Sequence, residues 1–134
     1  MAELIVKNYQ KADQVRSFVG HGHLDVVTFD LITMGRAIFE PGFRWSADVK
    51  PLAGTESCDL RHTGYCLSGR MHIRMDNGDE QEIAAGDAFD IPAGHDAWVI
   101  GDEACVMLDF TAAEEYAAPM KEGKVEVAPA ATIH

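Results

Sequence analysis

Short runs of alternating apolar and polar residues fill the chain from about Leu24 onward. The runs lie at 24–29, 36–39, 64–68, 70–75, 80–83, 87–91, 97–100 and 104–110, with glycine, proline, asparagine and aspartate between them. Side chains two positions apart share one face of a strand, so this alternation is typical of strands that bury one face. The pattern therefore predicts an all-β sandwich or barrel of short antiparallel strands.

The segments between and beyond these runs carry weaker signals. Asn77-Gly78 predicts a tight hairpin between two strands, because both residue types tolerate a positive φ. Residues 46–55 contain serine, aspartate, proline and glycine and are expected to form a loop. Residues 111–117 suit a short helix with Thr111 as its cap. Residues 11–18 fit either a helical turn or a strand, and the tail at 119–134 is expected to be loosely ordered.

The hydrophobic runs also predict a core. We expect it to contain Val27, Phe29, Ala37, Phe39, Tyr65, Leu67, Phe89, Ile91, Val106 and Leu108, with Cys66 and Cys105 inside the strands. At 134 residues, the chain is the size of one domain with one such core.

Charge and cysteine content narrow the classes of partner and compartment. The net charge is −11 and the pI about 4.8, so the surface repels phosphate backbones and anionic lipid. We therefore expect no nucleic-acid or membrane partner. No apolar run approaches the ~20 residues that a membrane span needs, and the N-terminus does not resemble a signal peptide. Three cysteines cannot all pair within one chain, so we expect reduced thiols and a cytoplasmic location.

A candidate metal site emerges from strand parity. Glu56, Cys58 and His62 lie at even spacing on a segment that leads into the run at 64–68, so one face of an extended chain can present all three. Carboxylate, thiolate and imidazole are side-chain types that bind transition metals. His95 follows the turn Pro92-Ala93-Gly94 and reaches the same place if the two segments lie side by side.

The turns around these residues resemble the two signatures of the cupin superfamily. Gly86, Pro92 and Gly94 match the second signature, G-x5-P-x-G-x2-H-x3-N, whose histidine position falls on Ala97. In the first signature, G-x5-H-x-H-x3,4-E-x6-G, counting back from Gly69 places His62 at the glutamate position. Cys58 and Glu56 then occupy its two histidine positions. None of the four usual ligands is present as such, but His95, one strand period before Ala97, keeps the parity of the missing histidine.

The resemblance covers about residues 54–110 and implies a single domain at 1–134. Its fold would be an antiparallel cupin-type β-barrel, also called a jelly roll or double-stranded β-helix. Cupins commonly pair through sheet edges, so the resemblance also implies a homodimer. The segment Leu4-Ile5-Val6 and the strand near Val106–Phe110 are candidates to cover those edges.

The resemblance further implies a bound divalent transition metal. A set of one thiolate, two imidazoles and one carboxylate is softer than the usual cupin ligands, which favours Zn²⁺, with Fe and Ni as the other candidates. If Glu56 turns away, three protein ligands leave one position for water, or Asp96 completes the site. An alternative interpretation makes Cys58 a small buried hydrophobe and the histidines hydrogen-bonded core or rim residues.

Two function classes remain open. In the first, the protein is a metal-dependent enzyme that acts on a small carbonyl- or carboxylate-bearing molecule. Arg44 would hold an anionic group, Tyr65 or Asp96 would transfer protons, and Trp98 would line the mouth of the pocket. In the second, the protein is a non-catalytic module that binds or senses a small ligand. One barrel fold hosts many activities, so the fold does not choose between them.

Overall fold

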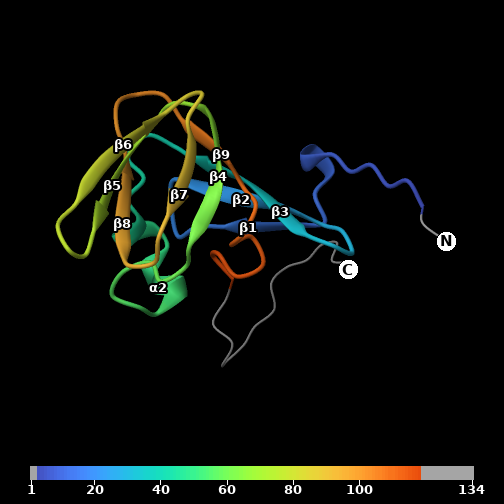
Figure 1. The fold of residues 1–134 in the computed structure, drawn as a ribbon, viewed down its shortest axis with the longest axis horizontal. Helices are drawn as coiled ribbons and strands as arrows, with labels where there is room; N and C mark the ends of the chain where they lie inside the picture. Colours follow the sequence, from blue (N-terminus) through green and yellow to red (C-terminus); the bar gives the residue numbers. More distant parts are fainter. Residues whose placement is uncertain (1–2, 119–134) are drawn as a thin grey trace.

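The computed structural model describes residues 3–118, where nine strands form two antiparallel sheets (Figure 1). The strands are β1 (Gln14–Ser17), β2 (Gly22–Thr28), β3 (Thr33–Phe39), β4 (His62–Ser68), β5 (Arg70–Met75), β6 (Glu80–Ala84), β7 (Ala88–Ile91), β8 (His95–Val99) and β9 (Cys105–Asp109). The short helical turns are η1 (Tyr9–Lys11), α1 (Trp45–Asp48) and α2 (Lys50–Ala53). The all-β prediction is confirmed.

Strands far apart in the sequence lie side by side. The larger sheet has the order β1-β2-β3-β9-β4-β7 and the smaller sheet the order β6-β5-β8. The last strand therefore sits between β3 and β4, and β5 pairs with both β6 and β8. This is the jelly-roll arrangement expected for a cupin-type fold, although the two sheets are not closed into a barrel. The predicted tail at 119–134 lies outside the described residues.

The predicted core is right for β2 and β3. In β4 and β9 it is right for Cys66 and Cys105 but wrong for the other predicted side chains. Strand β4 begins with an inward-facing His62, so the period of two buries Gly64 and Cys66 and leaves Tyr65 40% and Leu67 47% exposed. In β9, Cys105 and Met107 are buried, while Val106 and Leu108 are only half-buried. Phe29 and Phe89 are half-buried as well. Hydrophobicity selected Tyr65, Leu67, Val106 and Leu108, whereas strand parity directs their neighbours inward.

Gly64 shows why a small residue faces inward on β4. A Cβ at this position would collide with the carbonyl oxygen of Leu108 on β9 and lie 2.9 Å from a ring carbon of Phe89. Glycine therefore permits the close approach of β4 to its neighbours, and with it the inward position of His62 two residues earlier.

Outside the strands, the predicted hairpin is confirmed, while the predicted loop and the predicted C-terminal helix differ from the structure. The Asn77-Gly78 hairpin joins β5 to β6, with the positive φ carried by Gly78 alone. Residues 46–55, expected to form a loop, contain α2 and the last three residues of α1. Residues 111–117 form turns instead of the expected helix. Thr111 does not cap a helix there, because its hydroxyl donates to the carbonyl oxygen of Arg61 at 3.1 Å, and the Asp109 carboxylate accepts from the backbone at the start of the turn.

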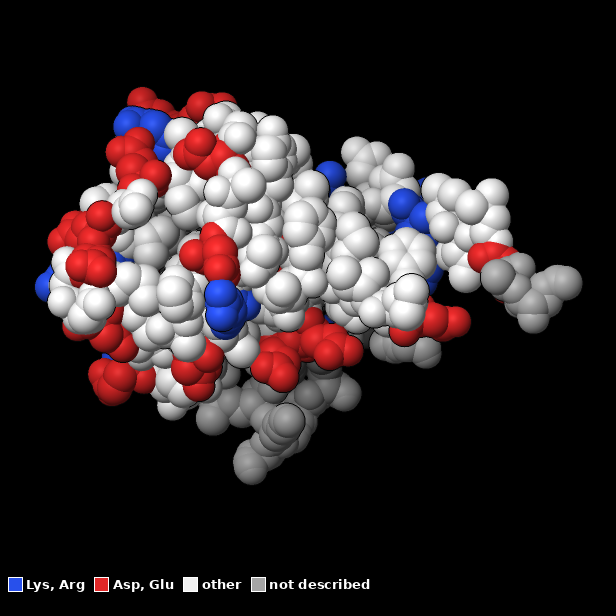
Figure 2. Space-filling model, viewed as in Figure 1, with Lys and Arg blue, Asp and Glu red and all other residues white. Residues whose placement is uncertain are grey.

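Charge is unevenly distributed over the surface. On the face shown in Figure 2, a broad uncharged area covers the strands of the larger sheet, and acidic side chains gather beside the C-terminal turn at its lower edge. Within residues 3–118, no helix has the length and apolar character that a bilayer crossing requires.

Candidate metal centre

A single backbone bridge brings two of the predicted ligands together. The N–H of Cys58 donates to the carbonyl oxygen of His95 at 2.8 Å, and the N–H of Gly94 donates to the carbonyl oxygen of Cys58 at 2.7 Å. Gly94 has a φ of 93°, which glycine adopts without strain. The Pro92-Ala93-Gly94 turn therefore docks the loop before β4 against the start of β8.

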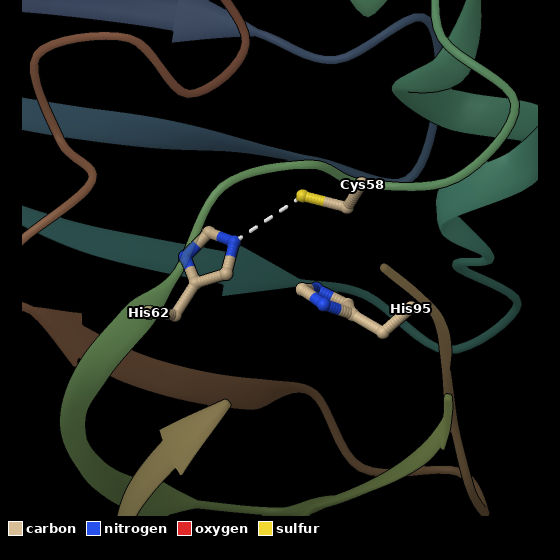
Figure 3. Close-up of side chains that lie close together, drawn as sticks. All are labelled: Cys58, His62 and His95. Carbon is tan, nitrogen blue, oxygen red and sulfur yellow. Dashed lines mark hydrogen bonds between the residues drawn. The ribbon is translucent and has the colours of Figure 1, made fainter. Parts of the chain in front are cut away.

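Cys58, His62 and His95 converge at this point (Figure 3). One ligand atom from each residue lies within 4.8 Å of the others, and the three side chains are buried. The Cys58 sulfur lies 3.4 Å from His62 Nε2, and the two imidazole rings have their centroids 5.3 Å apart. The convergence comes from a loop and the first residues of β4 and β8, which face inward in both strands.

Both histidines have one ring nitrogen engaged by an acceptor. His62 Nδ1 lies 2.6 Å from Oδ2 of Asp109, and His95 Nδ1 lies 2.9 Å from the carbonyl oxygen of Pro92. An acceptor at Nδ1 places the ring proton there and leaves Nε2 with a free lone pair in the neutral ring. In metal sites, a hydrogen bond from the other ring nitrogen to a carboxylate or a carbonyl oxygen orients the histidine in the same way.

Protonation at the cluster follows from these contacts. Burial raises the pKa of Cys58, but hydrogen bonding to His62 and His95 outweighs it and lowers the pKa to about 7. Burial lowers the pKa of His62, but hydrogen bonding to Asp109 and Cys58 raises it to about 9. Burial likewise opposes ionisation of Asp109, and its bond with His62 holds the pKa of that carboxyl below the ordinary value. Between these two pKa values, the metal-free cluster is mostly a thiolate paired with an imidazolium.

The donor set fits a tetrahedral transition metal. Zinc–sulfur and zinc–nitrogen bonds of ~2.3 and ~2.0 Å place neighbouring ligand atoms roughly 3.5 Å apart at a tetrahedral angle. The Cys58–His62 separation of 3.4 Å matches that spacing. Without a metal, Cys58, His62 and Asp109 have the arrangement of a thiol, a base and a carboxylate that orients the base, as in a nucleophilic relay.

A small cavity lies next to the cluster. It has a volume of about 40 Å³, and its lining includes both histidines, Trp45, Tyr116 and apolar side chains of both sheets. The Tyr116 ring meets His62 edge-on at a centroid distance of 5.0 Å. Burial raises the pKa of Tyr116 well above its ordinary value, so the phenol stays protonated at neutral pH. The described lining contains no lysine or arginine.

The structure does not bring Glu56 to the cluster. Its side chain is 96% exposed and forms an ion pair of 3.1 Å with Lys50 on α2. The segment before β4 is not a continuous strand, so the parity that joined Glu56 to Cys58 does not hold there. Of the predicted ligands, the structure brings together Cys58, His62 and His95.

The residues predicted to bind a small molecule lie away from the cluster. Strand β8 points His95 inward, so Asp96 and Trp98 take the opposite parity and face outward. There Arg44 stacks over Trp98 at 4.1 Å and lies 3.4 Å from Asp96. Asp96 also accepts from the N–H of Ser46 at 3.1 Å, so it is not a ligand of the cluster. Tyr65 faces outward from β4.

Sequence reasoning missed Asp109 and Tyr116. Asp109 lies on β9, 47 positions after His62, and only the pairing of β4 with β9 brings the two together. Its parity with the buried Cys105 and Met107 was a usable signal, because a carboxylate on an inward face needs a partner. Tyr116 gave no such signal, since it belongs to a turn without a regular period.

Comparisons with known proteins support the fold. No protein-family model and no curated protein sequence matches the chain. Among solved structures, the polyketide cyclase RemF from Streptomyces resistomycificus is similar with a TM-score of 0.58 and 14% identity, over 87% of this chain and 82% of its own. A cupin-like protein from Thermotoga maritima is similar with a TM-score of 0.50 and 16% identity, over 71% of each chain.

A third solved structure, a protein of unknown function from Acinetobacter sp. ADP1, has a TM-score of 0.53 and 12% identity over 73% of this chain and 89% of its own. Identities in this range bear on the fold and not on the activity. The chain thus has a cupin-type fold, and its site must be argued from its own residues.

Proposed function

We propose that this protein binds one divalent transition metal ion through Cys58, His62 and His95 and uses it to act on a small carbonyl-bearing molecule. The observation that carries the proposal is the convergence of three buried ligand atoms within 4.8 Å of one another. Burying a thiol and two imidazoles together is costly unless they have partners, and a metal satisfies all three at once.

Zinc is the metal that this ligand set favours. One thiolate and two imidazoles are softer than the histidines and glutamate of the usual cupin site, which shifts preference toward Zn²⁺ and leaves Fe and Ni as weaker candidates. With Glu56 on the surface, the protein supplies three ligands. Three protein ligands plus one open position is the pattern of catalytic zinc, whereas four is the structural pattern.

Residues around the proposed metal would have separate roles in the reaction. A bound metal would polarise a carbonyl oxygen as a Lewis acid. Asp109 would hold the His62 ring in place, and the apolar lining of the cavity would exclude water. Tyr116, which remains a neutral phenol, would hold a proton beside the site.

One observation favours the second class, a non-catalytic binding or sensing module. The inner cavity of about 40 Å³ holds only a few water-sized groups, as each needs about 10–15 Å³. A module that binds or senses a very small ligand fits that volume, while an enzyme needs additional room for its substrate.

Turnover separates the two classes. We would incubate the zinc-loaded protein with a panel of small carbonyl compounds and follow each by mass spectrometry, with and without a chelator. Turnover that disappears on chelation and returns with zinc supports the enzyme. Saturable binding without turnover, unchanged by chelation, supports the sensor. The matched control is Glu56→Gln, which changes a predicted ligand that lies outside the cluster.

We also infer a homodimer in a reducing compartment such as the cytoplasm. Tyr65 and Leu67 are exposed on the outer face of β4, and Tyr65 pairs in register with the half-buried Leu108 on β9. A second copy that covers this apolar area removes it from water. All three cysteines are free thiols, in keeping with a reducing compartment.

A further inference from the structure

A groove of about 440 Å³ is lined in part by Cys58, which does not belong to the lining of the small cavity. It lies between the two helical turns, the loop at 58–60 and the C-terminal turn at 114–118. Its volume falls within the range of sites that bind small molecules, roughly 300–1,000 Å³. Trp45 and Tyr116 line both the groove and the inner cavity, so they form the wall between the two spaces.

The groove combines an apolar floor with an acidic rim. The floor includes Val49, Leu52 and Leu60 from the elements on one side. The rim carries Asp59, Glu114 and Glu115, and the described lining has no lysine, arginine or histidine. Figure 2 shows acidic side chains gathered beside the C-terminal turn.

Two of the rim acids have no counter-ion within residues 3–118. Glu114 acts electrostatically on Arg16, whose guanidinium donates to the carbonyl oxygens of Ala113 and Tyr116 at 2.6 and 3.0 Å and so fixes the turn. Asp59 and Glu115 have neither a hydrogen bond nor an ion pair from their side chains in that part of the chain. Their field at the rim attracts cations and repels carboxylates.

An unpartnered polar group marks the inner wall. The indole nitrogen of Trp45 is buried and has no hydrogen-bond partner within residues 3–118, and the side chain is only 1% exposed. A buried donor without a partner costs free energy, so a shift of the ring that brings this N–H to an acceptor oxygen in the groove would be favourable. This donor belongs to the residue that separates the groove from the cavity beside the histidines.

We infer that this groove binds a small molecule with a cationic amino group, an apolar body and a carbonyl oxygen. The amino group pairs with Asp59 and Glu115, the body lies on the apolar floor, and the carbonyl accepts from Trp45 once the indole edge turns toward the groove. The inference rests on the proposed function in one respect, since it makes the groove the substrate site of the same metal centre. It replaces the anionic substrate expected from Arg44, which lies on the outer face of the smaller sheet.

Three amides of one shape and different charge test the inference. N-(2-aminoethyl)benzamide is cationic, N-(2-hydroxyethyl)benzamide is neutral and hippurate is anionic. Each would be titrated by calorimetry into the metal-free and the zinc-loaded protein. We expect the cation to bind at least about tenfold more tightly than hippurate, which corresponds to ~1.4 kcal/mol. The difference should shrink at high salt, as rim charges are screened.

The double variant Asp59→Asn/Glu115→Gln locates the effect. It should abolish most of the preference for the cation. The control variant Asp102→Asn/Glu103→Gln changes the net charge equally in the turn between β8 and β9 and should retain the preference. Trp98→Phe leaves Trp45 as the single tryptophan, and its fluorescence should change with the same dissociation constant as the calorimetry gives.

The outcomes separate this inference from the proposed metal function. Equal affinity for the three amides, an equal loss in both double variants, or an unchanged Trp45 fluorescence overturns the groove site even if zinc binds. A preference for the cation in the metal-free protein that the rim variant removes supports the groove site even if zinc does not bind.

Discussion

His62 and Asp109 lie 47 positions apart in the sequence, yet Nδ1 of the imidazole is 2.6 Å from the carboxylate oxygen. The contact joins the first residue of β4 to the last residue of β9, both facing inward. It fixes the ring so that Nε2 points toward Cys58 and His95. The proposed site therefore depends on a residue that binds no metal.

Replacing this carboxylate tests its role as a positioning residue. We expect Asp109→Asn to weaken zinc binding by at least about tenfold, because outer-shell partners typically contribute 10–100-fold in metal affinity. Competition with a chromophoric chelator measures the affinity. The matched control is Asp90→Asn on β7, whose carboxylate pairs with Arg61 on the surface. Equal zinc affinity in Asp109→Asn and wild type would contradict the role.

Proton release on metal binding follows from the two shifted pKa values. At pH 8, Cys58, with a pKa of about 7, is mostly thiolate, and His62, with a pKa of about 9, is mostly protonated. Zinc must displace the His62 proton, so binding should release about one proton at pH 8 and about two at pH 6, where Cys58 is protonated as well.

Zinc affinity should therefore fall steadily as the pH drops. Calorimetry in buffers with different ionisation enthalpies counts the protons. In His62→Gln the thiol loses the hydrogen bond that lowers its pKa, so Cys58 should supply the proton and the count should stay near one at both pH 8 and pH 6. A wild-type proton count that does not change between pH 6 and pH 8 would show that the thiol and imidazole are not coupled as the structure has them.

The fold could be predicted from the sequence more completely than the candidate metal site could. Turn glycines and period-two runs found the strands, because these signals are local. Parity within β4 was harder to read, since Gly64 and Cys66 face inward although Tyr65 and Leu67 are more hydrophobic. Only the contact of β4 with β9 decides which face is buried.

Candidate metal ligands could be predicted where they lie on a regular strand or next to a recognisable turn. Cys58, His62 and His95 were found from the two signatures and their spacing. Glu56 was not excluded, because the chain before β4 is irregular and carries no parity. The prediction placed Asp96 and Trp98 in the same pocket as His95. They lie one and three positions after His95 on β8, so parity puts them on the opposite, outward face.

Gly64→Ala tests the close approach of β4 to β9. The added methyl group collides with the backbone of Leu108, which a side-chain rotation does not relieve, so we expect a loss of about 3 kcal/mol in the free energy of unfolding. Gly78→Ala, where a Cβ meets nothing within 4 Å but φ is 98°, should cost about 1 kcal/mol. Urea titrations measure both. Equal losses would refute the packing argument.

The outer face of β4 is expected to form the homodimer. Sedimentation velocity at tens of micromolar protein should give a dimer mass for the wild type and a monomer mass for Leu67→Glu, because a charge in an apolar interface is costly to bury. The control is Leu31→Glu, at a site 96% exposed in the turn between β2 and β3, which should stay dimeric. A wild-type monomer would rule out the interface.

Metal stoichiometry tests the central claim most directly. Protein freed of metal by a chelator would be titrated with Co²⁺ while the thiolate-to-cobalt charge-transfer band is followed, and then with Zn²⁺ to displace it. The account predicts one equivalent bound, a charge-transfer band, and loss of both in Cys58→Ala and His95→Ala, with Glu56→Gln unchanged. Binding of less than one equivalent by the wild type, or equal occupancy in wild type, Cys58→Ala and His95→Ala, would contradict it.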